Sequence, residues 1–173
     1  DCAELFLNGK SQGSKCKNPK SDNSTERFRL MWKDVIYQPG ELKVIAYKAG
    51  KKIGESIVRT ADQPYKIRLS PDRNTIKANG KDLSYILVEA LDKNGNLCPL
   101  AGNSIEVKLS GAGELAGIDN GNPQSMTSFK STTIDLFYGK AMLIIGSNNT
   151  AGNVNVRVIS KELKEAVTTL KTE

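Results

Sequence analysis

The stretch NVNVRVI at residues 153–159 places Val154, Val156 and Val158 at every second position, with polar residues between them. Successive side chains of a β-strand point to opposite faces, so this alternation is typical of a strand with one face buried and one in water. Valine is β-branched and also favours extended backbone. We therefore expect a half-buried strand here.

The same alternation recurs along the chain, whereas helical periodicity is nearly absent. SYILVEAL at residues 84–91 alternates, and AMLII at residues 141–145 is almost wholly apolar, as in a central strand. Turn residues separate such segments, including Asn8-Gly9, Pro39-Gly40 and DKNGN at residues 92–96. Further strands are expected at residues 4–7, 42–46, 53–59, 105–109 and 166–170. Strand, turn and strand at this spacing predict an all-β sandwich fold.

The segment TADQPYK at residues 60–66 is short, polar and contains a proline, so we place a domain boundary there. We predict two tandem immunoglobulin-like β-sandwich domains, residues 1–62 and 63–173. A domain of about 60 residues buries only about 60% of its unfolded surface. The first domain would therefore depend on the second or present an unpaired strand edge.

Residues 17–32 are expected to run from a polar loop, ending near Ser24, into a strand at RFRLMW, residues 27–32. In that strand Phe28, Leu30 and Trp32 would share one apolar face. Trp32 is accordingly expected in the core rather than as an exposed ring for sugar.

Charge and hydropathy argue against a nucleic-acid-binding protein and against a segment that spans a membrane. The net charge is +6, from 25 Lys and Arg against 19 Asp and Glu, but it is dispersed and not interleaved with aromatic rings, which argues against nucleic-acid binding. No apolar run approaches the roughly 18 to 20 residues that span a bilayer. The chain opens at Asp1 directly into a strand pattern rather than a signal peptide.

Three cysteines make an odd count, which does not suggest a disulfide framework. We expect Cys2, Cys16 and Cys98 to be free thiols. The alternative is a bridge between Cys2 and Cys16, which flank a predicted hairpin.

The residues offer little catalytic chemistry. Histidine is absent, which excludes histidine triads, bases and metal ligands. Carboxylates such as Glu106, Glu114 and Asp119 are expected on solvated strand and loop positions, and the DKNGN segment lacks the distal glutamate of a calcium loop. We predict no catalytic, cofactor-binding or metal-binding residue, and no hydrolysis by this chain alone.

Three motifs carry a resemblance to a known family: ELFLNGK at residues 4–10, WKDVIYQPGELKVIAYKAGK at residues 32–51 and GIDNGNP at residues 117–123. The chain resembles the C-terminal accessory region of bacterial family 2 glycoside hydrolases of the β-galactosidase type. Its second half is also similar to bacterial immunoglobulin-like modules, through residues 71–82 and 151–160. The resemblance implies an upstream catalytic barrel as partner, catalytic glutamates outside this chain, a further strand before residue 4, and a periplasmic or cell-surface location.

Two sets of residues are candidates for function. Asp119, Asn120 and Asn122 form either a structured turn or a loop that faces a neighbouring domain or controls substrate access. Tyr37 and Tyr138 are the better candidates for exposed rings that stack on sugar. The alternative functions are therefore a carbohydrate-binding module that holds polysaccharide, and a structural or adhesin-type segment.

Overall fold

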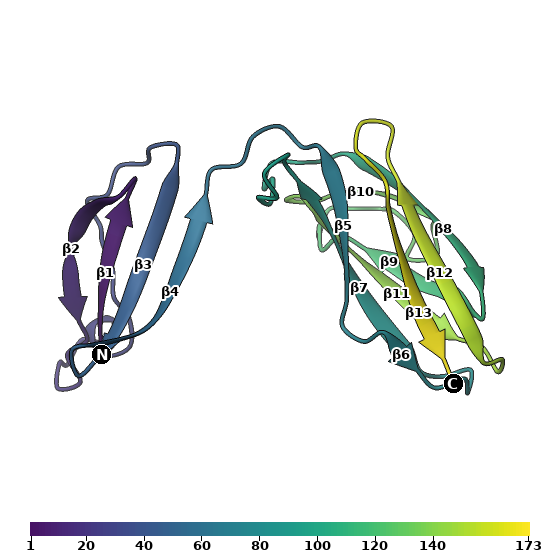
Figure 1. Cartoon of the computed structure of the whole chain (residues 1–173), viewed down its shortest axis with the longest axis horizontal. Helices are drawn as coiled ribbons and strands as arrows, with labels where there is room; N and C mark the ends of the chain where they lie inside the picture. Colours follow the sequence, from purple (N-terminus) through teal and green to yellow (C-terminus); the bar gives the residue numbers. More distant parts are fainter. The chain divides into compact units, whose positions relative to one another are not determined.

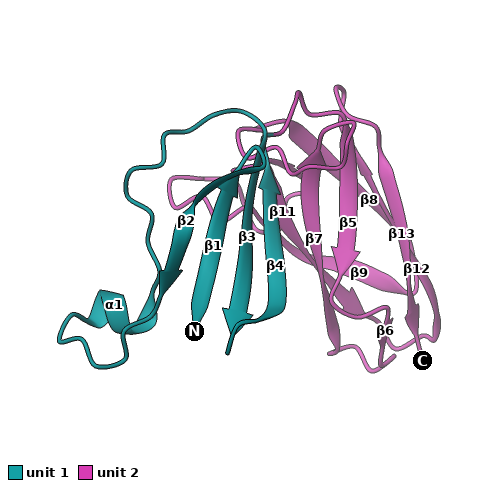
Figure 2. Ribbon diagram, turned by 60° about the vertical axis from the view of Figure 1, so that its left-hand side comes forward, with its two compact units in different colours: residues 1–60 teal, residues 61–173 magenta.

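The structure, a computed structural model, describes residues 1–173 and contains thirteen strands and one short helix. The chain divides into two compact units, residues 1–60 (unit 1) and residues 61–173 (unit 2), coloured separately in Figure 2. Every sheet pairing but one is antiparallel (Figure 1). The predicted all-β fold class is confirmed. The structure holds no helix with the length and apolar character needed to cross a membrane.

Unit 1 is built on a single four-stranded sheet with the order β2-β1-β3-β4. Its strands are β1 (Cys2–Leu7), β2 (Lys10–Cys16), β3 (Glu41–Lys48) and β4 (Lys51–Arg59). The predicted Asn8-Gly9 turn is confirmed, with φ of 50° and 79°. Both residues therefore adopt the left-handed conformation of a tight hairpin turn. Residues 1–60 supply no second sheet.

The predicted strand at residues 27–32 is wrong. Residues Ser24–Phe28 form the helix α1, and residues 29–40 belong to no strand. Asn23 explains the change, because its side chain accepts a hydrogen bond from the backbone N–H of Thr25 and caps the helix. Phe28 is exposed, whereas Trp32 is half-buried and donates its indole N–H to the Gly13 carbonyl at 3.0 Å.

One face of the unit 1 sheet is apolar but incompletely covered. The strand register places Leu7, Leu42 and Val58 in line across β1, β3 and β4. Leu7 is buried, yet Val58 is 66% exposed and every residue of β4 is exposed. The covering therefore reaches β1 but not the edge strand β4.

Unit 2 is a two-sheet sandwich. One sheet has the order β10-β8-β12-β13-β6 and the other the order β5-β7-β11-β9. The strands are β5 (Lys66–Pro71), β6 (Thr75–Ile76), β7 (Leu83–Leu91), β8 (Ser104–Gly111), β9 (Gly113–Asp119), β10 (Thr133–Asp135), β11 (Lys140–Ser147), β12 (Gly152–Ile159) and β13 (Ala166–Thr172).

The core of unit 2 lies between these two sheets and follows the predicted alternation. Val154, Val156 and Val158 of β12 are fully buried, as are Leu143 and Ile145 of β11. The predicted strands at residues 84–91, 141–145 and 153–159 are confirmed, and residues 160–165 connect the antiparallel strands β12 and β13 as expected. The sequence missed β9, because its glycines and small residues weaken the alternation.

Candidate functional site

The loop that follows β9 begins with a self-bonded turn. Asp119 Oδ1 accepts the backbone N–H of Asn120 at 2.7 Å, and Asn120 Oδ1 accepts that of Asn122 at 2.9 Å. Asn122 Oδ1 then accepts the N–H of Gln124 at 3.0 Å. The Asn120 side chain also donates to the Asp135 carbonyl at 2.8 Å, which ties the turn to β10. These polar groups hold the shape of the turn and are occupied in doing so.

The rest of this loop presents apolar side chains to solvent. Met126 is 97% exposed and Phe129 is 66% exposed. The backbone beneath them is fixed, because the Phe129 carbonyl accepts the Ile118 N–H at 2.9 Å and Lys130 Nζ donates to the Ala116 carbonyl at 2.6 Å. The loop therefore holds two large apolar side chains in solvent on a hydrogen-bonded backbone.

Tyr138 occupies a tight turn between β10 and β11. It has a φ of 50°, and Gly139 has a φ of 73°. A Cβ at Gly139 would lie 2.2 Å from the Cys98 carbonyl oxygen, so only glycine fits there. The Tyr138 side chain is 65% exposed, and its ring lies edge-on to that of Phe137 with centroids 4.5 Å apart.

Tyr37 belongs to unit 1, so the structure does not join it with Tyr138 in one unit. Its ring is 73% exposed, and its hydroxyl lies 3.2 Å from Thr60 Oγ1. Thr60 Oγ1 also accepts the Gly40 N–H at 3.0 Å. Each unit therefore offers one of the two predicted rings.

A groove of about 750 Å³ opens in unit 2 beside the ends of β8, β10 and β12. Its carboxylates are Glu106, Asp135 and Glu162, and its cation is Lys161. No aromatic side chain lines it. The Asn103 amide donates to Glu162 Oε2, so one of these carboxylates is already engaged.

The DKNGN segment closes on its own aspartate. Asp92 is buried and accepts the Asn96 N–H at 2.8 Å, the Asn96 side-chain amide at 2.9 Å and the Asp62 N–H at 3.0 Å. Burial by itself would raise the pKa of Asp92, but these hydrogen bonds, together with one from the Asn94 backbone, outweigh it and hold the pKa at about 2. The segment is a turn, as predicted, and its carboxylate ties the start of unit 2 to the end of β7.

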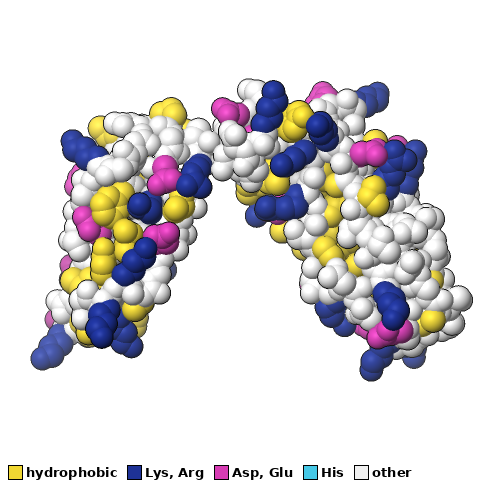
Figure 3. All heavy atoms as spheres, viewed as in Figure 1, with side chains coloured by type: hydrophobic (Ala, Val, Ile, Leu, Met, Phe, Trp, Pro, Cys, Tyr) yellow, Lys and Arg dark blue, Asp and Glu magenta, His cyan; other side chains and the backbone are white.

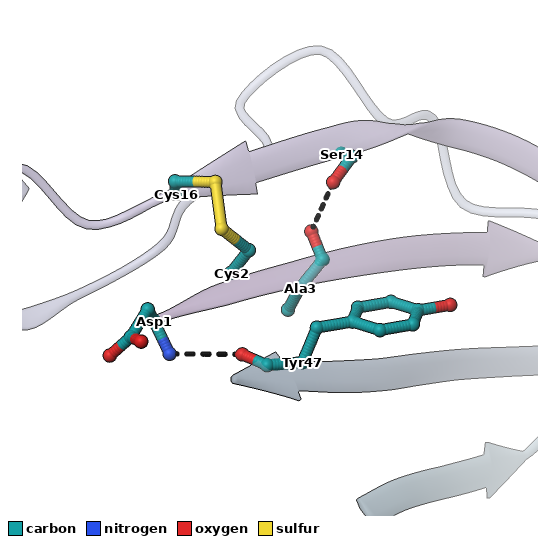
Figure 4. The surroundings of a disulfide bond; sticks show 6 residues. All are labelled: Asp1, Cys2, Ala3, Ser14, Cys16 and Tyr47. Carbon is teal, nitrogen blue, oxygen red and sulfur yellow. Dashed lines mark hydrogen bonds between the residues drawn. A yellow bond between two sulfur atoms is a disulfide. The ribbon is translucent and has the colours of Figure 1, made fainter. Parts of the chain in front are cut away.

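Cys2 and Cys16 form a disulfide, so the expectation of three free thiols is wrong for two of them. The hairpin register places Cys2 of β1 directly opposite Cys16 of β2 (Figure 4). Beside them the Asp1 ammonium donates to the Tyr47 carbonyl at 3.0 Å, which joins β1 to β3. The position of both cysteines on either side of the Asn8-Gly9 turn was the signal for this bridge. Counting residues outward from the turn does not place Cys2 opposite Cys16, because a bulge between Glu4 and Phe6 shifts the register by one residue. Cys98 is free and buried.

Two family patterns match the chain in succession. A domain of unknown function, DUF4982, matches residues 1–54, and the glycoside hydrolase family 2 C-terminal domain 5 matches residues 67–169. The second match covers most of the two-sheet sandwich. The chain belongs to the glycoside hydrolase family 2 C-terminal domain 5 family.

Similar glycosidases match over all or nearly all of the chain. The chain is 42% identical to β-galactosidase BoGH2A of Bacteroides ovatus over 173 residues. The aligned residues make up 100% of this chain and 20% of that protein. A β-glycosidase from Bacteroides vulgatus superposes with a TM-score of 0.89 at 29% identity, covering 99% of this chain and 21% of that one. A family 2 member from Bacteroides cellulosilyticus gives 0.85 at 32% identity, again over 99% and 21%.

The chain thus spans about a fifth of the length of these relatives. It corresponds to the C-terminal accessory region of family 2 glycoside hydrolases, as the sequence motifs predicted. The candidate residues of this region do not form one site. Asp119, Asn120 and Asn122 belong to the loop that is tied to β10 in unit 2, and Tyr138 follows β10 in the chain. Tyr37 lies in unit 1.

Proposed function

We propose that the full-length protein is a β-galactosidase-like glycosidase, and that this chain supports its catalytic domain. The observation that carries the proposal is the 42% identity to a β-galactosidase over every residue of the chain. The chain lacks histidine, and neither the β-sandwich nor the single sheet is a βα barrel. Hydrolysis would then take place in the preceding part of the protein.

The test compares the full-length protein, the same protein ending before residue 1 of this chain, and the chain alone. Each is assayed on an aryl β-galactoside and an aryl β-glucuronide. We expect the full-length protein to hydrolyse the galactoside, the isolated chain to hydrolyse neither, and the shortened protein to lose stability. Full activity and unchanged melting temperature in the shortened protein would refute the supporting role, and no β-galactosidase activity in the full-length protein would refute the substrate class.

The loop after β9 is the surface that we propose for contact with the catalytic part. The exposed side chains of Met126 and Phe129 support this role, because they are free to contact a neighbouring domain. The polar side chains of Asp119, Asn120 and Asn122 accept hydrogen bonds within the loop instead. In the full-length protein, Met126→Ser with Phe129→Ser should lower the melting temperature. In the isolated chain the same change should leave it unaltered, and an equal drop in both would show an effect on the sandwich itself.

Unit 1 supports a second part of the proposal, that the chain before residue 1 adds the missing layer over its apolar face. A single sheet with an exposed apolar face and an exposed edge strand is rarely stable alone. Extending the chain toward the N-terminus by about 30 residues should protect β4 amides from hydrogen exchange. Unchanged exchange in β4 would argue against this layer.

We propose a periplasmic or cell-surface location. The Cys2–Cys16 disulfide supports it, because disulfides form and persist in oxidising compartments. Thiol labelling of the protein in intact cells and in extracts should find only Cys98 free after denaturation. Three free thiols in protein taken directly from cells would contradict an oxidising location.

The alternative function is a carbohydrate-binding module, and the exposure of Tyr37 and Tyr138 is the observation that favours it. Retention of the chain on insoluble galactans would support it, with Tyr37→Ala and Tyr138→Ala as separate variants because the rings lie in different units. Equal retention of both variants and the wild type would remove these two residues from the proposal.

A further inference from the structure

Tyr65 lies at the start of unit 2, immediately before β5, and two lysine side chains lie over its ring. Lys164 Nζ is 4.8 Å and Lys93 Nζ is 5.5 Å from the centroid of its ring. The backbone fixes this arrangement, because Tyr65 N–H donates to the Leu91 carbonyl and Lys164 N–H donates to the Tyr65 carbonyl, both at 2.8 Å. Three segments that are distant in sequence therefore meet around one phenol.

The charge at this place is not neutralised. Lys66, Lys93 and Lys164 form no ion pair, whereas nearby Arg68 and Lys140 both pair with Glu89 (at 2.6 Å and 3.8 Å). The Lys164 side chain is the main cause of a lowered pKa of the Tyr65 phenol, and the charges of Lys93 and Lys66 lower this pKa further. In Figure 3, several dark blue side chains lie around the end of unit 2 where β5 begins, with a few magenta side chains among them.

Two carboxylates of the adjoining loops, Asp62 and Asp92, form no ion pair with these lysines. Asp92 is buried and accepts hydrogen bonds from Asn96 and from the Asp62 backbone. Asp62 Oδ2 is 3.4 Å from the amide of Asn94. The phenol and the three ammonium groups thus offer hydrogen-bond donors that form no ion pair within the chain.

We propose that Tyr65, Lys66, Lys93 and Lys164 form a binding site for an acidic sugar residue, one that carries a carboxylate or a sulfate. Ammonium and phenol donors bind an oxyanion through charge-assisted hydrogen bonds. The half-buried Tyr65 ring adds apolar surface beside those donors, the combination that orients small polar ligands in protein sites. The choice of a glycan as ligand rests on the proposed function. The site would hold acidic chains close to the enzyme without taking part in hydrolysis.

The test measures binding of the 173-residue chain to an oligogalacturonate hexamer, its methyl-esterified and uncharged counterpart, and a chondroitin sulfate hexasaccharide. Calorimetry gives the affinity, and NMR shifts of Tyr65 and Lys93 amides give the location. We expect binding of the two acidic glycans only. The double variant Lys93→Gln, Lys164→Gln should weaken this binding by at least about tenfold, because both lost ammonium groups would donate charge-assisted hydrogen bonds to the oxyanion. Binding should also weaken as the salt concentration rises from about 20 to about 200 mM, because salt screens the attraction between exposed charges.

The matched control is Lys81→Gln. Lys81 is exposed, forms no ion pair and precedes the first residue of β7, whereas Lys93 follows the last residue of this strand. This control should change affinity less than twofold, and Tyr65→Phe tests the hydroxyl while keeping the ring. Variants are compared only at unchanged melting temperature. Equal loss in Lys81→Gln, or equal binding of the esterified hexamer, would overturn the site. Tighter binding of a glutamate decapeptide than of either glycan would overturn the glycan and indicate an acidic protein partner. All of these outcomes are independent of whether the full-length protein hydrolyses galactosides.

Discussion

At the scale of single residues, the polar groups that matter most in unit 2 are aspartates at strand ends. Asp72 Oδ1 accepts the Ser84 hydroxyl and the Tyr85 N–H, and Asp82 Oδ2 accepts the Lys77 N–H at 2.8 Å. Asp92 performs the same task at the far end of β7. These carboxylates replace strand pairing where the backbone turns away from the sheet.

Asp92→Ala should destabilise unit 2 strongly, because it removes the acceptor of three hydrogen bonds at a buried position. We expect the melting temperature to fall by more than about 5 °C. Asp135→Ala, at an exposed position of β10, is the control and should shift it by less than about 2 °C. Similar shifts for the two variants, measured by calorimetry, would contradict the role assigned to Asp92.

Acid should weaken unit 2 through the same residues. Hydrogen bonds outweigh the effect of burial and hold the pKa of Asp72 and of Asp92 below the ordinary value of 3.8, and a hydrogen bond from the Lys77 backbone is the main cause of the lowered pKa of Asp82. A depressed folded-state pKa contributes stability that is present above pH 3.8 and is lost as pH falls toward about 2. Melting temperature followed from pH 6 to pH 2 should therefore drop below pH 4. In Asp92→Asn the drop should be smaller, and a parallel curve would argue against Asp92 as a contributor.

At the scale of elements, the hairpin of β1 and β2 depends on a covalent link. β2 is an edge strand with almost no buried side chain, so little apolar packing holds it to the sheet. The disulfide joins its last residue to the first residue of β1, across a separation of 14 residues. A crosslink of this length limits the unfolded chain and stabilises the folded one.

Replacing Cys2 and Cys16 with serine should destabilise unit 1 by about 3 kcal/mol, the amount expected for a loop of about 15 residues. Trp32 is the only tryptophan and lies in unit 1, so its fluorescence during urea unfolding reports this unit. Adding a reducing agent should produce the same loss in the wild type and no further loss in the variant. A reducing agent without effect on the wild type would show that the bridge does not stabilise the hairpin.

At the scale of the whole molecule, the apolar core is distributed very unequally between the units. Among the buried apolar residues only Ala3 and Leu7 belong to unit 1. All others lie in unit 2, most of them between its two sheets. Stability that comes from burial of apolar surface should therefore reside in residues 61–173.

Residues 61–173 should fold alone and unfold cooperatively, while residues 1–60 alone should not. Far-ultraviolet circular dichroism and amide NMR dispersion of the two separate fragments check this. Dispersed amide signals from residues 1–60 would show that a single disulfide-linked sheet is sufficient. A non-cooperative transition of residues 61–173 would show that the sandwich needs unit 1.

The sequence by itself determined the strands whose alternation is strong, the tight turns and the family. Alternating valines in β12 and the apolar run in β11 specify which face is buried, because a strand has only two faces. The Asn8-Gly9 turn and the GIDNGNP motif are likewise local, since few residues accept a positive φ. The absence of histidine excluded histidine triads, histidine general bases and histidine metal ligands from the sequence alone.

Only the tertiary structure decided the features that depend on partners distant in sequence. RFRLMW alternates like a strand, yet Asn23 caps a helix there and Trp32 bonds to β2 instead. The Cys2–Cys16 bridge depends on a bulged register, and the single sheet of unit 1 depends on which strands are available to pair. Tyr65 gains its lysines from two other loops. Periodicity reports which way a side chain points, but only the fold decides which other side chains lie beside it.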